Sequence, residues 1–378
     1  MSKTLHVAVL EPYYGGSHAA FVDAVKLHSR HRITLVTMPA RKWKWRMRGA
    51  AIWFAKDAND WLRKTDRGPA DAILANDMLS IADLRALLPA DYRNIPIICY
   101  FHENQLTYPI PDEQERDYQY GMTNITSCLA ADAVWFNSRF HLESFLAAAE
   151  ELLDKMPDYV PREALQEIHG KAEVLPPPVD AGRTRREPRP PKQPMTILWC
   201  HRWEYDKNPE PFFNALMRLD EEGYDFHLVL VGEQFRTAPL VFANVRNRLR
   251  SHIVHAGFLP ERADYLSMLS RCDVVVSTSI QENFGIAVVE AILAGCQPLL
   301  PNRLVYPELI PPKLHGECLY PSDAELYERL RALFAGHGRL SPTVADELQS
   351  TIESRYSVAS ALPRLDEGLA TVVDRCSH

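Results

Sequence analysis

Glu282 and Glu290 lie eight positions apart, in a segment that ends at Gly295. The segment predicts a buried strand, a polar turn, a helix from about Phe284 and a helix stop at the glycine. Eight positions span slightly more than two helical turns, so Glu290 can share a face with the loop residue Glu282. Two carboxylates so placed could accept hydrogen bonds from the hydroxyls of a sugar and of a ribose. The candidate binding residues of this turn and helix are Glu282, Asn283, Phe284, Gly285, Ile286 and Glu290.

Arg202 and Lys207 follow a predicted strand, in the loop before a helix that begins near Pro209. A guanidinium and an ammonium group there suit a clamp for a diphosphate, because they neutralise the charge that builds up on a departing phosphate. The helix near Phe284 offers the same anion its free backbone N–H groups and the positive end of its dipole. We therefore expect Arg202, Lys207 and Glu282 to be catalytic.

Two polar segments in the first half of the chain also follow predicted strands. Gly15 and Gly16 stand between a strand and a helix, where they permit a tight turn or a close approach of a ligand to the backbone. His102 follows another strand beside three hydrogen-bonding side chains, which are costly to bury unless they face a cleft. We expect His102 to be catalytic and its three neighbours, Glu103, Asn104 and Gln105, to contact an acceptor.

Residues 41–48 hold five basic side chains, two tryptophans and no acid. Cations for phosphates and aromatic rings for stacking on bases favour RNA binding. An anionic membrane surface suits the same pattern, and so does a merely solvated basic face. The candidate acceptor contacts in this stretch are Lys42, Trp43, Lys44, Trp45, Arg46 and Arg48.

The composition limits the class of protein. The 378 residues are enough for two domains, and the formal net charge of −7 excludes a globally basic nucleic-acid binder. The seven cysteines are an odd number without a Cys-x-x-Cys pair, which favours reduced thiols in a cytoplasmic protein. No apolar stretch is long enough to predict a transmembrane helix. Asp-x-Asp, His-Glu-x-x-His, Walker and Gly-x-Gly-x-x-Gly motifs are missing, so we expect no metal and no nicotinamide cofactor.

Short apolar runs alternate with amphipathic stretches, which predicts an α/β protein with two doubly wound parallel sheets. The proline-rich residues 181–194 are predicted to link a domain of residues 1–180 to one of residues 195–356. A cleft between the two sheets would place the strand ends of both around a ligand. The stretch 342–376 is predicted to be helical, and we expect a helix of about 357–378 to pack back on the first domain.

These segments resemble the retaining GT-B glycosyltransferases, a likeness that covers most of the chain. It is carried by Asp132–Ser138, Val174–Asp180, Leu228–Glu233 and the Glu-x7-Glu spacing. The resemblance implies that Glu290 binds the nucleotide ribose and Glu282 the donor sugar, while Arg202 and Lys207 bind the diphosphate. It also implies that His102 lies near the sugar, that Gly15 and Gly16 form the donor-facing loop, and that Gly232 lies at the donor site. The Arg-x4-Lys spacing is one residue shorter than many members show.

Four longer motifs resemble the tRNA-queuosine mannosyltransferase family: Ala40–Arg48, Tyr100–Pro109, Gln114–Gly121 and His201–Glu204. This resemblance implies transfer of mannose from GDP-mannose to the queuosine base of tRNA(Asp), with the acceptor on the N-terminal half. The leaving phosphate would take the acceptor's proton, so His102 would position the sugar. Two alternatives stay open: a glycosyltransferase with a lipid or saccharide acceptor, and a catalytically silent binding module. The sequence predicts no oligomeric state.

Overall fold

The computed structural model describes residues 3–62, 69–110, 115–182, 193–234, 239 and 241–377. The chain divides into two compact units. The first comprises Met1–Val179 together with Tyr356–His378, and the second comprises Asp180–Arg355. Most of the predicted linker, residues 183–192, lies outside the described residues.

The first unit is built on a parallel six-stranded sheet of order β2-β1-β3-β4-β5-β6. Its two central strands, β3 and β4, are buried along their whole length, as expected for a parallel sheet that is covered on both faces. The sequence predicts five of these strands and misses the short β6. Their bounds are β1 His6–Tyr14, β2 Arg32–Pro39, β3 Ala72–Asn76, β4 Ile97–Phe101, β5 Ala133–Phe136 and β6 Ala172–Val174.

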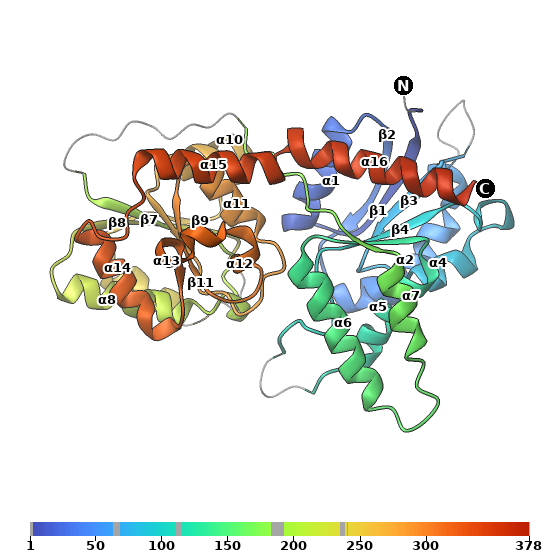
Figure 1. The fold of residues 1–378 in the computed structure, drawn as a ribbon, viewed down its shortest axis with the longest axis horizontal. Coiled ribbons are helices and arrows are strands. Elements are labelled where there is room, and N and C mark those ends of the chain that lie inside the picture. The colour runs from blue at the N-terminus through green and yellow to red at the C-terminus, as the bar shows by residue number, and fades with distance from the viewer. Residues whose placement is uncertain are drawn as a thin grey trace. The chain divides into compact units, whose positions relative to one another are not determined.

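Helices pack on both faces of this sheet (Figure 1). On one face, Phe21 of α1 and Leu365 and Leu369 of α16 share a core with the strands. On the other face, the core includes Phe54 of α2 and Phe145 of α6. The structure thus places α16, from the end of the chain, in the first unit. The helices are α1 Gly16–His28, α2 Trp43–Lys56, α3 Ala58–Leu62, α4 Ile81–Leu87, α5 Tyr118–Ala130, α6 Arg139–Asp154, α7 Glu163–Gly170 and α16 Val358–Cys376, with a 3-10 turn η1 at Ala90–Tyr92.

The second unit has its own parallel six-stranded sheet, of order β12-β11-β10-β7-β8-β9. The sequence predicts all of its strands except β12. They are β7 Met195–Trp199, β8 Phe226–Val231, β9 Ile253–Gly257, β10 Val274–Val276, β11 Gln297–Pro301 and β12 Leu319–Tyr320. The helices are α8 Pro209–Glu221, α9 Val241–Arg248, α10 Arg262–Ser270, α11 Ile286–Leu293, α12 Tyr306–Leu309, α13 His315–Cys318, α14 Leu326–Phe334 and α15 Pro342–Tyr356, with 3-10 turns η2 Tyr205–Lys207, η3 Pro312–Leu314 and η4 Asp323–Glu325.

The structure corrects one predicted boundary. The helix expected from about Phe284 begins at Ile286, because Gly285 caps it with a φ of 84°, a left-handed conformation that favours glycine. The helical stretch predicted over 342–376 is confirmed, and its last helix begins at Val358, close to the predicted 357, because Ser357 is extended. The backbone beside Ser357 pairs with Val179, whose N–H donates to the carbonyl of Tyr356 over 2.7 Å.

Among the residues described, no helix is long and apolar enough to cross a membrane.

Candidate active site

Glu282 lies in a loop of the second unit that is fixed from several sides. The three residues after β10, Ser277 to Ser279, are fully buried. The Ser277 hydroxyl bonds to the Tyr306 hydroxyl at 2.7 Å, and the Arg303 guanidinium donates to the carbonyl oxygens of Thr278 and Ser279. The turn before Glu282 is thereby held in one conformation before any ligand binds.

Lys207, at the end of η2, joins this loop to the loop after β7. Its ammonium group donates to the carbonyl oxygen of Gln281 at 2.8 Å and lies 3.3 Å from carboxylate oxygens of both Glu282 and Asp206. Burial by itself lowers the pKa of Lys207, but the Glu282 and Asp206 carboxylates outweigh it and raise the pKa above its usual value. The side chain is therefore a buried cation, as a phosphate clamp requires.

Arg202 lies on the more exposed side of the same cluster. Its guanidinium is 3.2 Å from a Glu204 oxygen and 4.0 Å from an Asp206 oxygen. Asp206, almost fully buried, thus lies between the two predicted phosphate-binding cations. The sequence analysis did not single out Asp206, although it stands directly before Lys207 in the chain. The structure brings Arg202, Lys207 and Glu282 together around it.

Gly232, directly after β8, lies where only glycine fits. A Cβ atom there would lie 1.8 Å from the carbonyl oxygen of His201, which is a severe clash with backbone. The Trp203 N–H also donates to the carbonyl oxygen of Glu233 over 3.0 Å. The close approach at Gly232 therefore positions the loop that carries Arg202. Its predicted contact with a donor stays a prediction.

Glu290 is buried on α11, and α10 supplies the partners of its carboxylate. One oxygen accepts a hydrogen bond from Arg262 at 2.5 Å, and the other accepts one from the Tyr265 hydroxyl at 2.8 Å. Burial first, and then the Glu290 carboxylate, raise the pKa of Tyr265 well above its ordinary value, which keeps the hydroxyl a donor. Arg262 also donates to the carbonyl oxygen of Asp180. The carboxylate is thus oriented with no ligand bound.

The sequence analysis missed both Arg262 and Tyr265. They stand three positions apart, at a spacing that puts side chains on one face of a helix. That spacing is common, and only the fold shows that the shared face of α10 meets Glu290. Glu282, in contrast, makes its ion pair with Lys207.

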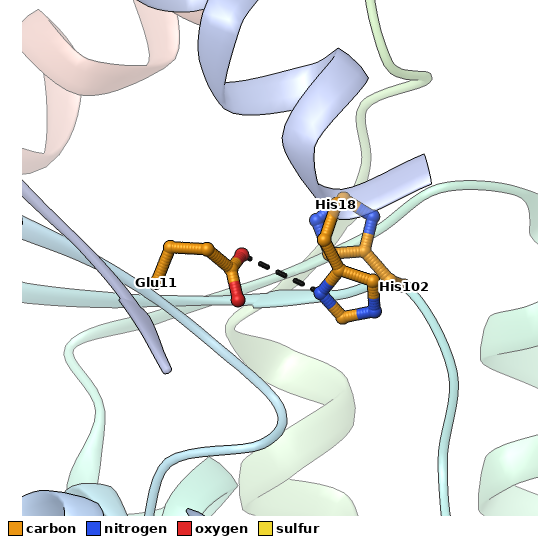
Figure 2. Close-up of side chains that lie close together, drawn as sticks. All are labelled: Glu11, His18 and His102. Atoms are coloured by element: carbon orange, nitrogen blue, oxygen red, sulfur yellow. Dashed lines mark ion pairs between the residues drawn. The ribbon is translucent and has the colours of Figure 1, made fainter. Parts of the chain in front are cut away.

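The first unit holds a second cluster, formed by Glu11 in β1, His18 in α1 and His102 after β4. Figure 2 shows the Glu11 carboxylate in an ion pair with His18 and the two imidazole rings close together. A carboxylate oxygen of Glu11 lies 3.4 Å from Nδ1 of His18, and the ring centroids of His18 and His102 are 4.3 Å apart. All three side chains are buried. Only His102 of the three is predicted from the sequence.

His102 is held by its backbone as well as by its ring. Its N–H donates to Asp77 over 2.8 Å, and its carbonyl oxygen accepts from the Asn137 amide over 3.0 Å. Phe21 meets the ring edge-on, with centroids 4.9 Å apart. Burial first, and then the charge of His18, lower the pKa of His102 well below its usual value. A neutral imidazole suits a role in positioning a sugar hydroxyl.

Gly15 caps α1 and Gly16 begins it, and the two glycines differ in their surroundings. Gly16 has a φ of 53° and open space where a Cβ would stand. A Cβ at Gly15 would lie 2.6 Å from the Cβ of Ala40. The loop therefore exposes backbone at Gly16, while Gly15 is glycine because of its close packing.

Of the three residues after His102, Asn104 and Gln105 are buried and Glu103 is half-buried. Asn104 is fully buried, and its side chain bonds within its own turn, to the N–H groups of Leu106 and Thr107 and to the Thr107 hydroxyl. These bonds give Asn104 a role in shaping the loop, and its contact with an acceptor stays a prediction. Gln105, also buried, donates to the carboxylate of Glu103 over 3.2 Å. Glu103 is half-buried and keeps its side chain nearest to solvent.

The basic and aromatic stretch begins α2 and turns most of its side chains to solvent. Lys42, Lys44, Trp45 and Arg48 are exposed, Trp45 by 63%, while Trp43 is half-buried against Tyr120. Arg46 differs from them, because it is buried and donates to the carbonyl oxygen of Pro39, and its contact with an acceptor stays a prediction. The same face of α2 continues past the predicted stretch through Ile52, Trp53 and Lys56, all exposed.

The ion cluster around Lys207 predicts a measurable loss of stability. Replacing Lys207 by methionine leaves the buried Asp206 carboxylate without its nearest cation, which costs roughly 3 kcal/mol. The thermal unfolding midpoint of Lys207→Met is therefore expected to fall, and the added change Asp206→Asn should restore part of the loss. Lys313→Met, at an exposed lysine of the same unit, is the matched control. An unchanged midpoint for Lys207→Met would show that the buried ion pairs do not stabilise the second unit.

Comparisons with known proteins cover both units. Residues 6–179 match the family described as tRNA-queuosine alpha-mannosyltransferase N-terminal, and residues 180–336 match Glycosyl transferases group 1. The chain is also similar over 41% of its length to 2-deoxystreptamine glucosyltransferase of Streptomyces kanamyceticus, at 28% identity and 38% of that protein.

Solved structures share the fold over nearly the whole chain. Sucrose-phosphate synthase from Thermosynechococcus elongatus has a TM-score of 0.75 at 14% identity, covering 98% of this chain and all of that one. Anabaena Alr3699/HepE in complex with UDP and glucose has a TM-score of 0.68 at 15% identity, covering 97% and 100%. With two parallel-sheet units, the fold is of the GT-B type.

A relative that matches most of the chain shows the family to which it belongs. The tRNA-queuosine alpha-mannosyltransferase of Drosophila melanogaster is 38% identical over 338 residues, which are 86% of this chain and 86% of that protein. With the N-terminal match over residues 6–179, the chain belongs to the tRNA-queuosine alpha-mannosyltransferase family, a family of glycosyltransferases.

Proposed function

We propose that this protein transfers mannose from GDP-mannose to the queuosine base of tRNA(Asp), with retention of configuration, in the cytoplasm. The observation that carries the proposal is the ion cluster of Lys207, Asp206 and Glu282, with Arg202 at its edge. It sets two cations beside the turn that leads into α11. Within this family, that arrangement suits a nucleoside diphosphate as leaving group.

In the proposed reaction, the bond between the anomeric carbon and the phosphate oxygen breaks as the bond to the acceptor oxygen forms on the same face. The leaving phosphate takes the acceptor's proton. Arg202, Lys207 and the backbone N–H groups at the start of α11 stabilise the charge on the departing GDP. Glu290 binds the ribose, Glu282 binds the sugar, and neutral His102 positions it, so no separate protein base is required.

We propose further that the transfer needs no metal. Glu11, His18 and His102 could offer a carboxylate and two imidazoles within 4.8 Å of one another, a set that suits zinc. The Glu11 carboxylate is already engaged, however: it accepts from the Tyr13 N–H at 2.7 Å and from the Asn76 amide at 2.5 and 2.6 Å. Excess EDTA is therefore expected to leave the rate of transfer unchanged, and a loss that added zinc restores would contradict this proposal.

The donor assignment is tested at Glu290, whose bonds to Arg262 and Tyr265 make a check on folding necessary. Glu290→Ala removes the acceptor of the ribose hydroxyls, so kcat/KM for GDP-mannose should fall by about 100-fold. Glu317→Ala, at an exposed glutamate of the same unit, should keep full activity. The measurement is transfer of labelled mannose to queuosine-containing tRNA, with thermal unfolding as the check on folding. Wild-type kcat/KM in a folded Glu290→Ala would exclude the assigned ribose site.

The acceptor side rests on the exposed face of α2. Its described side chains include Lys44, Arg48 and Lys56 together with Trp45 and Trp53, and no acid. The rings of Trp43 and Tyr120 lie side by side, and Lys44 and Arg48 are placed over Tyr120. Cations for the phosphates and flat rings for unstacked bases support RNA as the partner of this face.

We expect the triple variant Lys42→Gln, Lys44→Gln and Arg48→Gln to weaken tRNA binding and to flatten its salt dependence. Each lost phosphate contact removes roughly 0.7 to 0.9 from the slope of log K against log salt. Gel shifts at several salt concentrations measure the slope. The matched control replaces three exposed cations of the second unit, Arg218, Lys313 and Arg331. An unchanged slope combined with co-sedimentation on anionic liposomes would favour a lipid acceptor.

A further inference from the structure

We propose that Glu11 and His18 form a positioning pair that holds the His102 ring in place for the transferred sugar. This inference rests on the proposed function, because that function assigns His102 to the donor sugar. It adds a role for two buried residues that the proposed reaction leaves unused.

The pair is built from three separate elements. Glu11 ends the regular part of β1, His18 lies in the first turn of α1, and His102 follows β4. The side chains of Glu11 and His18 are 0% and 5% exposed, with 3.4 Å between carboxylate oxygen and Nδ1. The imidazole of His18 lies against that of His102, with 4.3 Å between centroids and 37° between planes. His18 therefore bounds one face of the His102 ring (Figure 2).

Asn76, at the end of β3, fixes this arrangement. Its amide oxygen accepts the Met78 N–H over 3.0 Å, which sets the orientation of the amide. Its amide nitrogen then donates to both carboxylate oxygens of Glu11 and lies 2.9 Å from Nδ1 of His18. Two neighbours of Nδ1 of His18 thus favour opposite protonation states of this nitrogen. The Asn76 amide suits a neutral, accepting nitrogen, and the Glu11 carboxylate suits a charged, donating one.

The surrounding charges favour the charged form. Burial alone lowers the pKa of His18, but Glu11 outweighs it, and Asp77 and Glu103 act in the same direction, so the pKa is raised to about 9. Among the described residues, the other titratable groups around His18 are His102, which is kept neutral, Tyr13, whose ring meets that of His18 edge-on, and Asp77, whose pKa is raised by burial. A buried imidazolium beside a neutral imidazole gives His102 one charge state across the physiological range.

The sign of the pH dependence follows from this. A raised pKa means that His18 is charged below about pH 9 and loses its charge as the pH rises through that value. The ion pair with Glu11 is then lost, and with it the constraint on His102. We expect kcat to fall on the alkaline side with the titration of His18, while KM for tRNA stays constant.

Two variants and a control test the pair. Glu11→Gln removes the negative charge, so the titration of His18 and the alkaline fall of kcat should both move to lower pH. His18→Gln should lower kcat by about 10- to 100-fold, the effect of a misplaced catalytic group. It should also abolish the alkaline fall of kcat. His31→Gln is the matched control, because His31 is equally buried in the same unit and hydrogen-bonded to Leu5 and Asp366. It should cost stability and leave the pH profile unchanged.

The protonation state is read directly by NMR of 15N-histidine-labelled full-length protein, titrated with and without Glu11→Gln. This readout needs no activity, so it separates the pair from the proposed function. If neither the wild type nor any variant transfers mannose, the proposed function is wrong. The NMR titration still shows in that case whether His18 is charged beside Glu11. A His18 that is neutral at pH 7, or a folded His18→Gln with wild-type kcat and pH profile, would overturn the inference.

Discussion

The candidate site of the second unit depends on the ion pairs that the buried ammonium group of Lys207 makes with two carboxylates. The two carboxylates, buried Asp206 and half-buried Glu282, come within 3.3 Å of this group, and Asp206 could not be buried at acceptable cost without a cation. The same group donates to the backbone at Gln281, which ties the loop after β7 to the loop that leads into α11. The charged side chains of the proposed donor site are thus held by one another and by the backbone, as an electrostatic site for a leaving diphosphate would need.

Both units bury polar side chains at the end of their strands, and they pair these side chains differently. Parallel strands end at one edge of a sheet, and the polar side chains at that edge must be paired when buried. The second unit pairs a lysine with two carboxylates and orients Glu290 from α10. The first unit pairs a carboxylate with an imidazole and sets a neutral imidazole beside it. Each arrangement lies where a unit of this family is expected to meet its substrate.

Much of this organisation could be predicted from the sequence. The short apolar runs predict ten of the twelve strands in the described residues, because a strand buried on both faces is a continuous apolar segment. The missed strands, Ala172–Val174 and Leu319–Tyr320, are short edge strands whose pairing depends on the assembled sheet. Arg202, Lys207 and Glu282 were singled out because loops after strands often carry chemistry, and the structure places them together. His18, Tyr265 and Arg262 were not singled out, because their partners are distant in sequence. The burial of Arg46 and Asn104 could not be predicted, because a pattern of residue types does not show which side chains are buried.

The most direct test of this account is mass spectrometry of nucleosides from queuosine-containing tRNA(Asp) after incubation with the purified protein and a nucleotide sugar. GDP-mannose and UDP-glucose are supplied in separate reactions, with tRNA that lacks queuosine as the control. The account predicts that queuosine gains one hexose from GDP-mannose alone and that the control tRNA stays unmodified. Transfer from UDP-glucose, or unmodified queuosine while mannose moves to a lipid or saccharide, would contradict it.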